Sequence, residues 1–386
     1  MTETTIDAGS ASTSKQKSNL VVPFVFAVLG AVGVACWVMQ VTGGSALALT
    51  NRTIWGLYIV GFMLCTGIAA GCLLFASSTV LFSGLAVYKP YARLGAACAV
   101  CVGAVGAGLF IMADLGSPAR FWEMIAFAHV GSPLFWDTII LLAYVVVGVL
   151  FTLQLTKSAT AGRDTSSLKP LAIIAFVAGV CVAITSFVFV FQVARPSWNN
   201  PGQTLSFVLS ALIAAGSVLM VVFALANRSG YLAMGNKLAS NLTRVLASLL
   251  LVEFIFVLTE IAAGVFAGQG SETLPVVWLI SGAGAPFFWA EIVAFAAAFV
   301  LLFQKNRTLQ VVGAVGSFSA VFLVKYNLLQ AELFNPLLNL TAYPGGTGVA
   351  SAFYLPSPIE WGVAVGVIGI VGLLFTLSMR KLKLGV

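Results

Sequence analysis

Long apolar stretches dominate the chain and are separated by short polar interruptions. Ten of these stretches hold roughly 20 residues each, which lets an α-helix cross about 30 Å of hydrocarbon. The pattern therefore predicts an all-α integral membrane protein with ten transmembrane helices. The predicted spans cover residues 20–40, 54–78, 94–112, 134–155, 171–193, 205–226, 246–267, 287–303, 309–329 and 361–379.

Two of these spans begin with similar sequences. The run SPLFWD at 132–137 opens the fourth span, and the run APFFWAE at 285–291 opens the eighth. A parallel duplication of a four-helix unit would place matched segments four spans apart and on one side of the membrane. We therefore expect two four-helix bundles, made of spans 2–5 and 6–9, with spans 1 and 10 at the periphery.

Composition agrees with a membrane protein, because the mean hydropathy is +1.05 and 8% of the residues are charged. Residues 1–19 are rich in Ser and Thr and have no apolar pattern, so we predict a disordered cytoplasmic tail there. Residues 20–386 then form one polytopic membrane domain. The first span is long and lacks a clear cleavage site, so we interpret it as an uncleaved anchor.

Basic residues indicate the orientation of the spans. Of the 19 Lys and Arg residues, 15 lie in the two tails and the even-numbered connections. The odd-numbered connections hold Arg52, Arg120 and Arg195, and Lys325 lies within a span. Cytoplasmic loops carry the excess of Lys and Arg, so both termini are predicted to be cytoplasmic. The net charge of +7 has the same origin, so we expect the lipid bilayer, and no nucleic acid, as a partner.

Cysteine and histidine limit the metal chemistry that we expect. The six cysteines all lie in apolar spans, and we interpret the CxxC pair Cys98 and Cys101 as packing residues. Too few thiols gather in one place for an iron–sulfur cluster or a structural zinc. The single histidine, His129, cannot supply the two axial ligands that a transmembrane cytochrome b haem needs. We expect no metal, haem or iron–sulfur cluster in this chain.

Charged residues within the spans gather in their outer halves. Asp114 closes the third span and Asp137 opens the fourth, while Lys325 lies one turn from the outer end of the ninth. An ionised group at the membrane centre costs about 2.5 to 3.5 kcal/mol on insertion scales, so such residues are usually functional. We predict proton transfer by Asp114, Glu253, Glu260, Glu291 and Lys325. The alternative is an ion pair of Lys325 with a Glu that only stabilises helix packing.

One connection carries a distinctive motif. It reads DLGSPARFW at 114–122, followed by HVGSP at 129–133 and Trp136. Further blocks are WGLY at 55–58, GIAAG at 67–71, RPSWN at 195–199, KYN at 325–327 and PIEW at 358–361. In combination they resemble the NrfD/PsrC-like family, the membrane subunits of polysulfide reductase and related respiratory complexes. The resemblance covers residues of about 50 to 380.

The resemblance implies a subunit that binds a quinone, menaquinone in our expectation, as substrate near the exoplasmic face of a bacterial cytoplasmic membrane. Electrons from the quinol would pass to a ferredoxin-like iron–sulfur subunit on that face. A molybdopterin catalytic subunit or a multihaem cytochrome would complete the complex. We expect quinol oxidation for a terminal reductase to be the direction.

Quinol oxidation needs hydrogen-bonding groups and a proton acceptor. We expect quinone binding by Tyr58, Asp114, Arg120, His129, Ser186 and Arg195. Docking of the partner is expected at Trp122, Trp136 and Trp198 in the outer connections. Arg120 would pair with Asp114 or tune it, and that pair could instead only fasten the loop; His129 could be an interfacial residue. The chain departs from the polysulfide-reductase pattern, because Tyr58 and Phe62 stand near the positions where an Asn and a His are usual, and Ser186 or Phe187 stands near that of a Tyr.

Two other classes of function stay open. A secondary transporter or proton-translocating module also uses intramembrane acids and duplicated bundles, and it predicts helices broken at the midplane. A passive membrane anchor of a soluble enzyme would leave Glu253 and Glu260 unexplained.

Overall fold

Apolar helices provide the regular structure of the chain. The computed structural model describes residues 20–43, 47–49, 53–127, 129–185, 187–192, 195, 197–266, 273–334 and 354–382. All regular secondary structure in those ranges is helical, and ten helical segments in them are long and apolar enough to cross a membrane. The prediction of an all-α protein with ten transmembrane helices is confirmed.

Eight of the ten spans are single helices, and two join several helical pieces. The single helices are α1 (Val21–Gly43), α2 (Leu57–Leu81), α6 (Pro133–Thr160), α9 (Pro201–Arg228), α10 (Asn236–Phe266), α12 (Ala285–Leu302), α13 (Arg307–Phe334) and α14 (Pro358–Leu382). The third span joins η1 (Ser83–Tyr88), α3 (Lys89–Ala97), the π-helix η2 (Cys98–Ala104) and α4 (Val105–Asp114), and the fifth joins η4 (Thr165–Leu168) to α7 (Lys169–Ile184). Short helices in the connections are η3 (Pro118–Arg120), α5 (Glu123–Ala126), α8 (Phe187–Val190) and α11 (Thr273–Ile280).

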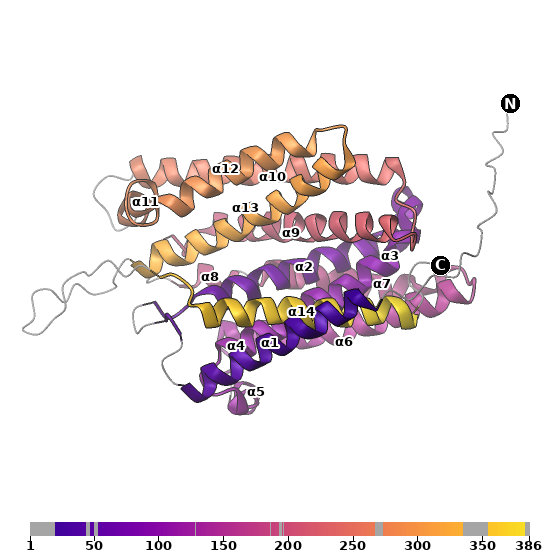
Figure 1. The fold of residues 1–386 in the computed structure, drawn as a ribbon, viewed down its shortest axis with the longest axis horizontal. Coiled ribbons are helices and arrows are strands. Elements are labelled where there is room, and N and C mark those ends of the chain that lie inside the picture. Colours follow the sequence, from indigo (N-terminus) through magenta and orange to yellow (C-terminus); the bar gives the residue numbers. More distant parts are fainter. Residues whose placement is uncertain are drawn as a thin grey trace, which may run out of the picture.

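The spans lie side by side along the long axis of the molecule (Figure 1). α2 packs against α3, α4 and α7, and α6 packs against α7. In the second half of the chain α12 packs against α13, while α10 and α13 both pack against α9. The two groups meet where α2 packs against α9, and α1 lies along α14.

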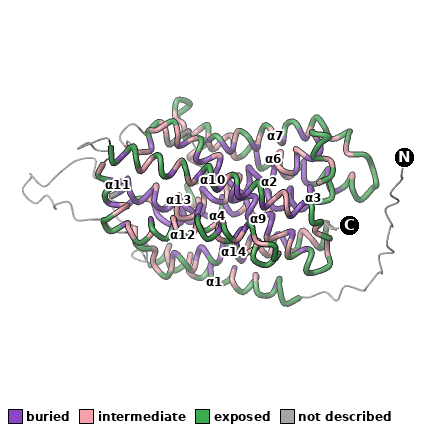
Figure 2. The backbone as a smooth tube through the Cα atoms, turned by 90° about the horizontal axis from the view of Figure 1, so that it is seen from above, coloured by how far each residue is buried: buried purple, intermediate pink, exposed green. Residues whose placement is uncertain are grey.

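The contact between α2 and α9 forms the centre of the bundle, as the purple buried residues of Figure 2 show. Glycine makes this contact possible. A Cβ atom at Gly67 would lie 2.9 Å from Ala211 Cα, and one at Gly71 would lie 2.4 Å from Ala215 Cβ. The two helix backbones therefore approach more closely than larger side chains would allow.

Helix α1 is the least buried of the ten spans. Buried residues make up 17% of the most apolar stretch of α1, compared with 72% in α2. A Cβ atom at Gly33 would lie 2.2 Å from Gly366 Cα, so the two helices cross backbone to backbone. The first helix thus packs mainly on the last one.

Two elements differ from the predicted spans. The third span begins at Ser83, eleven residues before the predicted residue 94, and its Arg93 is buried. The fifth span was expected to continue to residue 193, but α7 ends at Ile184 and a separate helix, α8, begins at Phe187. The Thr185 hydroxyl donates to Val182 O at 2.8 Å at this break, and hydroxyl groups that bond the preceding turn compete with helix continuation.

Candidate functional site

Two cavities lie at the same end of the bundle, where the spans meet the odd-numbered connections. The first cavity, of about 290 Å³, lies among α2, α4, α6, α7 and α9 and is lined by Trp55, Asp114, Asp137, Thr185, Phe207 and Ala211 among others. The second cavity, of about 260 Å³, lies among α9, α10, α11, α12 and α13 and is lined by Asn200, Gln203, Ser206, Glu260, Glu291 and Asn327 among others. Helix α9 contributes to both cavities and separates them.

The first cavity is apolar apart from a few oxygen groups. Asp114 is the last residue of α4, and its Oδ1 atom is buried without a hydrogen-bond partner among the described residues. Thr66 on α2 donates its hydroxyl to Met63 O at 2.9 Å. The aromatic side chains of Trp55 and Phe62 also line this cavity. An apolar cavity with a small number of placed polar groups is typical of sites for small organic ligands.

A hydrogen-bond chain holds the helix ends beside Asp114. The Tyr58 hydroxyl donates to Gln40 Oε1 at 2.6 Å, and Gln40 Nε2 donates to Ala113 O at 2.8 Å. Tyr58 is buried in a cluster with Phe110 and does not line either cavity. The structure thus places Tyr58, a predicted quinone ligand, where it joins α1, α2 and α4.

The connection after α4 separates residues that the sequence analysis grouped with Asp114. Arg120, whose side chain is 70% exposed, forms an ion pair with Glu123 at 2.7 Å. The expected pairing of Arg120 with Asp114 is not formed, because Glu123, three residues further along at the start of α5, is reached without burial. This hydrogen bonding to Glu123 raises the pKa of Arg120. The exposed His129 accepts a hydrogen bond at Nδ1 from Gly131 N at 3.1 Å.

The predicted docking tryptophans fall into two groups. Trp122 is 54% exposed and Trp136 is 49% exposed, and Trp136 Nε1 donates to Val130 O at 2.9 Å. Trp198 is only 3% exposed, and its Nε1 donates to Leu328 O at 3.0 Å. The expectation that Trp198 lies on a docking surface is therefore wrong.

Arg195 also takes a packing position. Its guanidinium donates to Glu332 O at 2.5 Å and lies 5.7 Å from the centroid of the Trp198 ring. Partial burial lowers the pKa of Arg195, and the nearby Glu332 opposes that effect. Arg195 thus ties the segment before α9 to the end of α13, and it lines neither cavity. Ser186, another predicted quinone ligand, lies outside the described residues.

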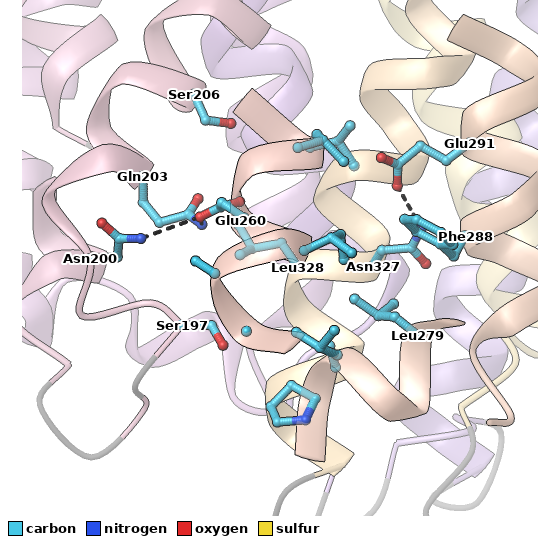
Figure 3. A pocket seen from close by; sticks show the side chains of 18 of the residues that line it. Ser197, Asn200, Gln203, Ser206, Glu260, Leu279, Phe288, Glu291, Asn327 and Leu328 are labelled. Atoms are coloured by element: carbon cyan, nitrogen blue, oxygen red, sulfur yellow. Dashed lines mark hydrogen bonds between the residues drawn. The ribbon is translucent and has the colours of Figure 1, made fainter. Parts of the chain in front are cut away.

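Two acidic side chains line the second cavity, and each is hydrogen-bonded to side-chain amides (Figure 3). Glu260 accepts hydrogen bonds from Gln203 Nε2 at 2.5 Å and Asn200 Nδ2 at 3.5 Å. Glu291 accepts one from Asn327 Nδ2 at 2.7 Å, and Asn327 Oδ1 has no partner among the described residues. The amide groups thus orient both carboxylates in the cavity wall.

Glu253 lies deeper than the second cavity, two helical turns before Glu260 on α10. Its Oε1 accepts hydrogen bonds from Ser206 Oγ at 2.7 Å and Ser210 Oγ at 2.9 Å. Its Oε2 is buried without a hydrogen-bond partner in the described part of the chain. One oxygen of this carboxyl group is therefore hydrogen-bonded, and the other has no partner there.

Lys325 is 2% exposed, and its ammonium lies 3.7 Å from the centroid of the Phe207 ring. Within the described ranges, Lys325 Nζ has no hydrogen-bond partner. The expected alternative, an ion pair of Lys325 with a Glu that serves packing, is not formed there.

The two halves of the chain share local structure at the repeated sequence. Both α6 and α12 have a proline in their first turn, as the SPLFWD and APFFWAE runs predict. The ring pair Phe135–Trp136 has centroids 5.4 Å apart with planes at 75°, and Phe288–Trp289 has 5.4 Å and 70°. Each of these helices then contributes an acid to a cavity, Asp137 to the first and Glu291 to the second.

The sequence profile of the family "Polysulphide reductase, NrfD" matches residues 46–334. The chain belongs to this family. The matched range includes the walls of both cavities, since their lining residues run from Trp55 to Ala331.

Individual relatives extend the NrfD similarity to almost the full length of the chain. A dimethyl sulfoxide reductase membrane subunit of Halobacterium salinarum is 26% identical, over 93% of this chain and 90% of its own. A selenate reductase subunit of Mesobacillus selenatarsenatis is 22% identical, over 92% of each chain. An Hdr-like menaquinol oxidoreductase integral membrane subunit of Archaeoglobus fulgidus is 23% identical, over 93% of this chain and 92% of its own.

Several residues that line the two cavities were not among the predicted site residues. They are Trp55, Thr66, Asp137, Thr185 and Phe207 in the first cavity and Asn200, Gln203 and Asn327 in the second. Thr66 and Thr185 are hydroxyl residues within apolar stretches, and that pattern could have identified them. Phe207 carries no such signal, because one Phe among the 29 in the chain is distinguished only by its neighbours in space.

Proposed function

We propose that this NrfD-family chain is the quinol-oxidising membrane subunit of a respiratory reductase complex, with the quinol site in the first cavity. Two relatives are named as subunits of a dimethyl sulfoxide reductase and a selenate reductase, and a third as a menaquinol oxidoreductase subunit. These names support a reductase that takes electrons from menaquinol. The terminal substrate differs between the relatives and is left open for this chain.

One observation carries the choice of cavity. Asp114 presents a buried carboxylate oxygen without a partner among the described residues, in the wall of an apolar cavity. Burying an unpaired polar atom is unfavourable, so a group of this kind is kept for a function. A quinol must give up protons as well as electrons, and Asp114 is placed to accept a proton from a hydroxyl of its head group.

The rest of the first cavity fits a quinol head group. Its volume of about 290 Å³ lies at the lower end of ligand pockets, roughly 300 Å³, so it holds a ring system and leaves the isoprenoid tail among lipid. Asp137 and Thr185 supply further hydrogen-bonding groups, while Trp55 and Phe207 supply aromatic walls. Such walls favour a flat ring through stacking.

The second cavity is proposed to handle protons. Glu260 and Glu291 lie in its wall, and the deeper Glu253 is joined to it through Ser206. Lys325 interacts electrostatically with all three carboxylates. Buried ionisable residues that line a polar cavity are typical of proton relays in membrane proteins.

The electron acceptor is proposed to dock on the exoplasmic face, over the connection between α4 and α6. Trp122 and Trp136 are exposed there, together with Arg120 and His129, and exposed Trp and Arg are enriched in protein interfaces. The partner would be a ferredoxin-like iron–sulfur subunit. A molybdopterin catalytic subunit, or a multihaem cytochrome in its place, would complete the complex in a bacterial cytoplasmic membrane.

Cavity filling tests the proposal. Ala183 lines the first cavity, whereas the next residue on α7, Ile184, is exposed. The affinity for a soluble naphthoquinone, measured on the purified complex by quenching of tryptophan fluorescence, should fall at least about tenfold in Ala183→Phe and stay unchanged in Ile184→Phe. Equal binding by both variants would exclude the first cavity as the quinone site.

Other functions are less well supported by the geometry. A secondary transporter would have helices broken at the midplane. The third span changes to the π-helix η2 at its middle but stays helical throughout, and the break between α7 and α8 lies at the first cavity near the helix ends. A passive anchor gives no reason to bury the atoms of Asp114, Glu253 and Lys325 that lack partners in the described structure. The quinol function gives all three groups a task.

A further inference from the structure

Helix α9 presents different residues to the two cavities. Ser206 and Ser210 face α10, where both donate to Glu253 Oε1. Phe207 and Ala211, one residue further along in each case, line the first cavity. Residues four apart lie on one helix face, so α9 is a wall one helix thick with a distinct surface on each side.

Lys325 lies against this wall. Its ammonium covers the Phe207 ring at 3.7 Å from the centroid, and the ring also lines the first cavity. Lys325 Nζ and Glu253 Oε2 are both buried, and neither has a hydrogen-bond partner among the described residues. An ammonium and a carboxyl group thus lie near α9 without being joined, and a cation over an aromatic ring is held only by the ring's weak negative face.

We propose that Lys325 is a positioning residue that couples the two cavities, by leaving the Phe207 ring for Glu253 when negative charge is lost from the first cavity. The coupling rests on the proposed quinol site. Its physical basis is that an ammonium in a medium of low dielectric constant responds to charges several ångströms away. The titratable groups involved are Asp114 and Asp137 at the first cavity and Glu253, Glu260 and Glu291 on the other side, with Glu253 protonated before the quinol reacts.

The proton balance of the coupling is simple. Oxidation of the quinol releases two protons, and its two electrons leave to the proposed acceptor; the coupling concerns the proton that Asp114 accepts. One negative charge then disappears from the first cavity, and the attraction that holds Lys325 on the ring weakens. Lys325 then pairs with Glu253 Oε2, which favours the ionised form of that carboxyl group. The proton that Glu253 releases passes towards Glu260 and the second cavity. Proton uptake by Asp114 thus causes proton release on the far side of α9.

Infrared difference spectroscopy of the purified complex tests this coupling. Addition of a soluble naphthoquinol should remove a protonated-carboxyl band that is missing in Glu253→Gln. The band change should be lost in Lys325→Met and in Phe207→Leu, and kept in Lys325→Arg and Phe207→Tyr. Turnover with naphthoquinol should fall roughly tenfold in Lys325→Met, which is within the usual range of coupling between two sites.

A matched control separates coupling from packing. Phe223 is buried on the same helix and contacts the rings of Phe75 and Tyr91, away from both cavities. Phe223→Leu should keep the band change. If Lys325→Met does not assemble, Phe207→Leu carries the test alone. A band change that persists in Phe207→Leu overturns the coupling while naphthoquinone binding stands, whereas failure of the Ala183→Phe test overturns the quinol site itself.

Discussion

Trp55 and Trp198 stack on one another, with ring centroids 5.5 Å apart and planes inclined by 17°. Trp55 lines the first cavity, and the neighbours of Trp198 in sequence, Ser197 and Asn199, line the second. The stacked pair therefore joins the outer walls of the two cavities. Trp198, which was predicted to dock the partner, therefore packs between the two cavities and supports their walls.

Trp198→Ala should strongly destabilise the protein. Removal of a buried Trp side chain costs about 3 to 5 kcal/mol, and here the stack with Trp55 and the hydrogen bond to Leu328 O are lost as well. Thermal unfolding of the purified complex should show a clear drop in midpoint. The exposed Trp122→Ala should keep the wild-type midpoint but weaken binding of the iron–sulfur partner, and the opposite pattern would return Trp198 to the docking surface.

Asp114→Asn should separate chemistry from assembly. The amide keeps the shape of the side chain but cannot accept a proton, so naphthoquinol-dependent turnover should fall by about two orders of magnitude, while reduction of the partner by an artificial donor is unchanged. His129→Ala should lower turnover by less than about threefold, because its imidazole is exposed and bonds only its own loop within the described structure. A loss of the partner from the Asp114→Asn complex would instead make Asp114 a structural residue.

The spans could be predicted because hydropathy is a local property of the chain. The boundaries failed where polar residues join a helix. Lys89 and Arg93 lie between the predicted spans 54–78 and 94–112, yet they belong to α3, where Arg93 is buried. The break after Ile184 was missed because Thr185 and Ser186 are only mildly polar within an apolar run.

The candidate site could be predicted in part. Asp114, Glu260 and Glu291 do line cavities, because charge in an apolar span has few other uses. The contacts of the basic residues could not be predicted. Arg120 pairs with Glu123 and Lys325 lies on the Phe207 ring, and both contacts depend on which groups come close in space. The division of Ser206 and Phe207 between two cavities is likewise decided by the packing around α9.

Reporter fusions should test the orientation that the basic residues predict. A reporter that is active only in the cytoplasm should be active when fused after Val386 or within residues 159–168. It should be inactive within residues 343–352, which lie outside the described residues. The prediction follows from the unequal distribution of Lys and Arg between the two sets of connections. Activity in the reverse pattern would move both cavities, and the docking surface, to the cytoplasmic side.

A pair of substitutions should distinguish a proton role of Glu260 from an ion pair with Lys325. If Lys325 merely neutralised Glu260, Lys325→Met combined with Glu260→Gln would remove both charges together and restore the activity that each single change lowers. The structure bonds Glu260 to Gln203 and Asn200, and it places the Lys325 ammonium on the Phe207 ring. We therefore expect the double variant to be at least as impaired as the worse single variant, in both naphthoquinol turnover and the proton release that accompanies it. Lys325→Met combined with Glu291→Gln is the matched control, because Glu291 bonds to Asn327, and it should show the same lack of rescue. Full recovery in the Glu260 pair alone would establish a permanent ion pair and remove Glu260 from the proton path.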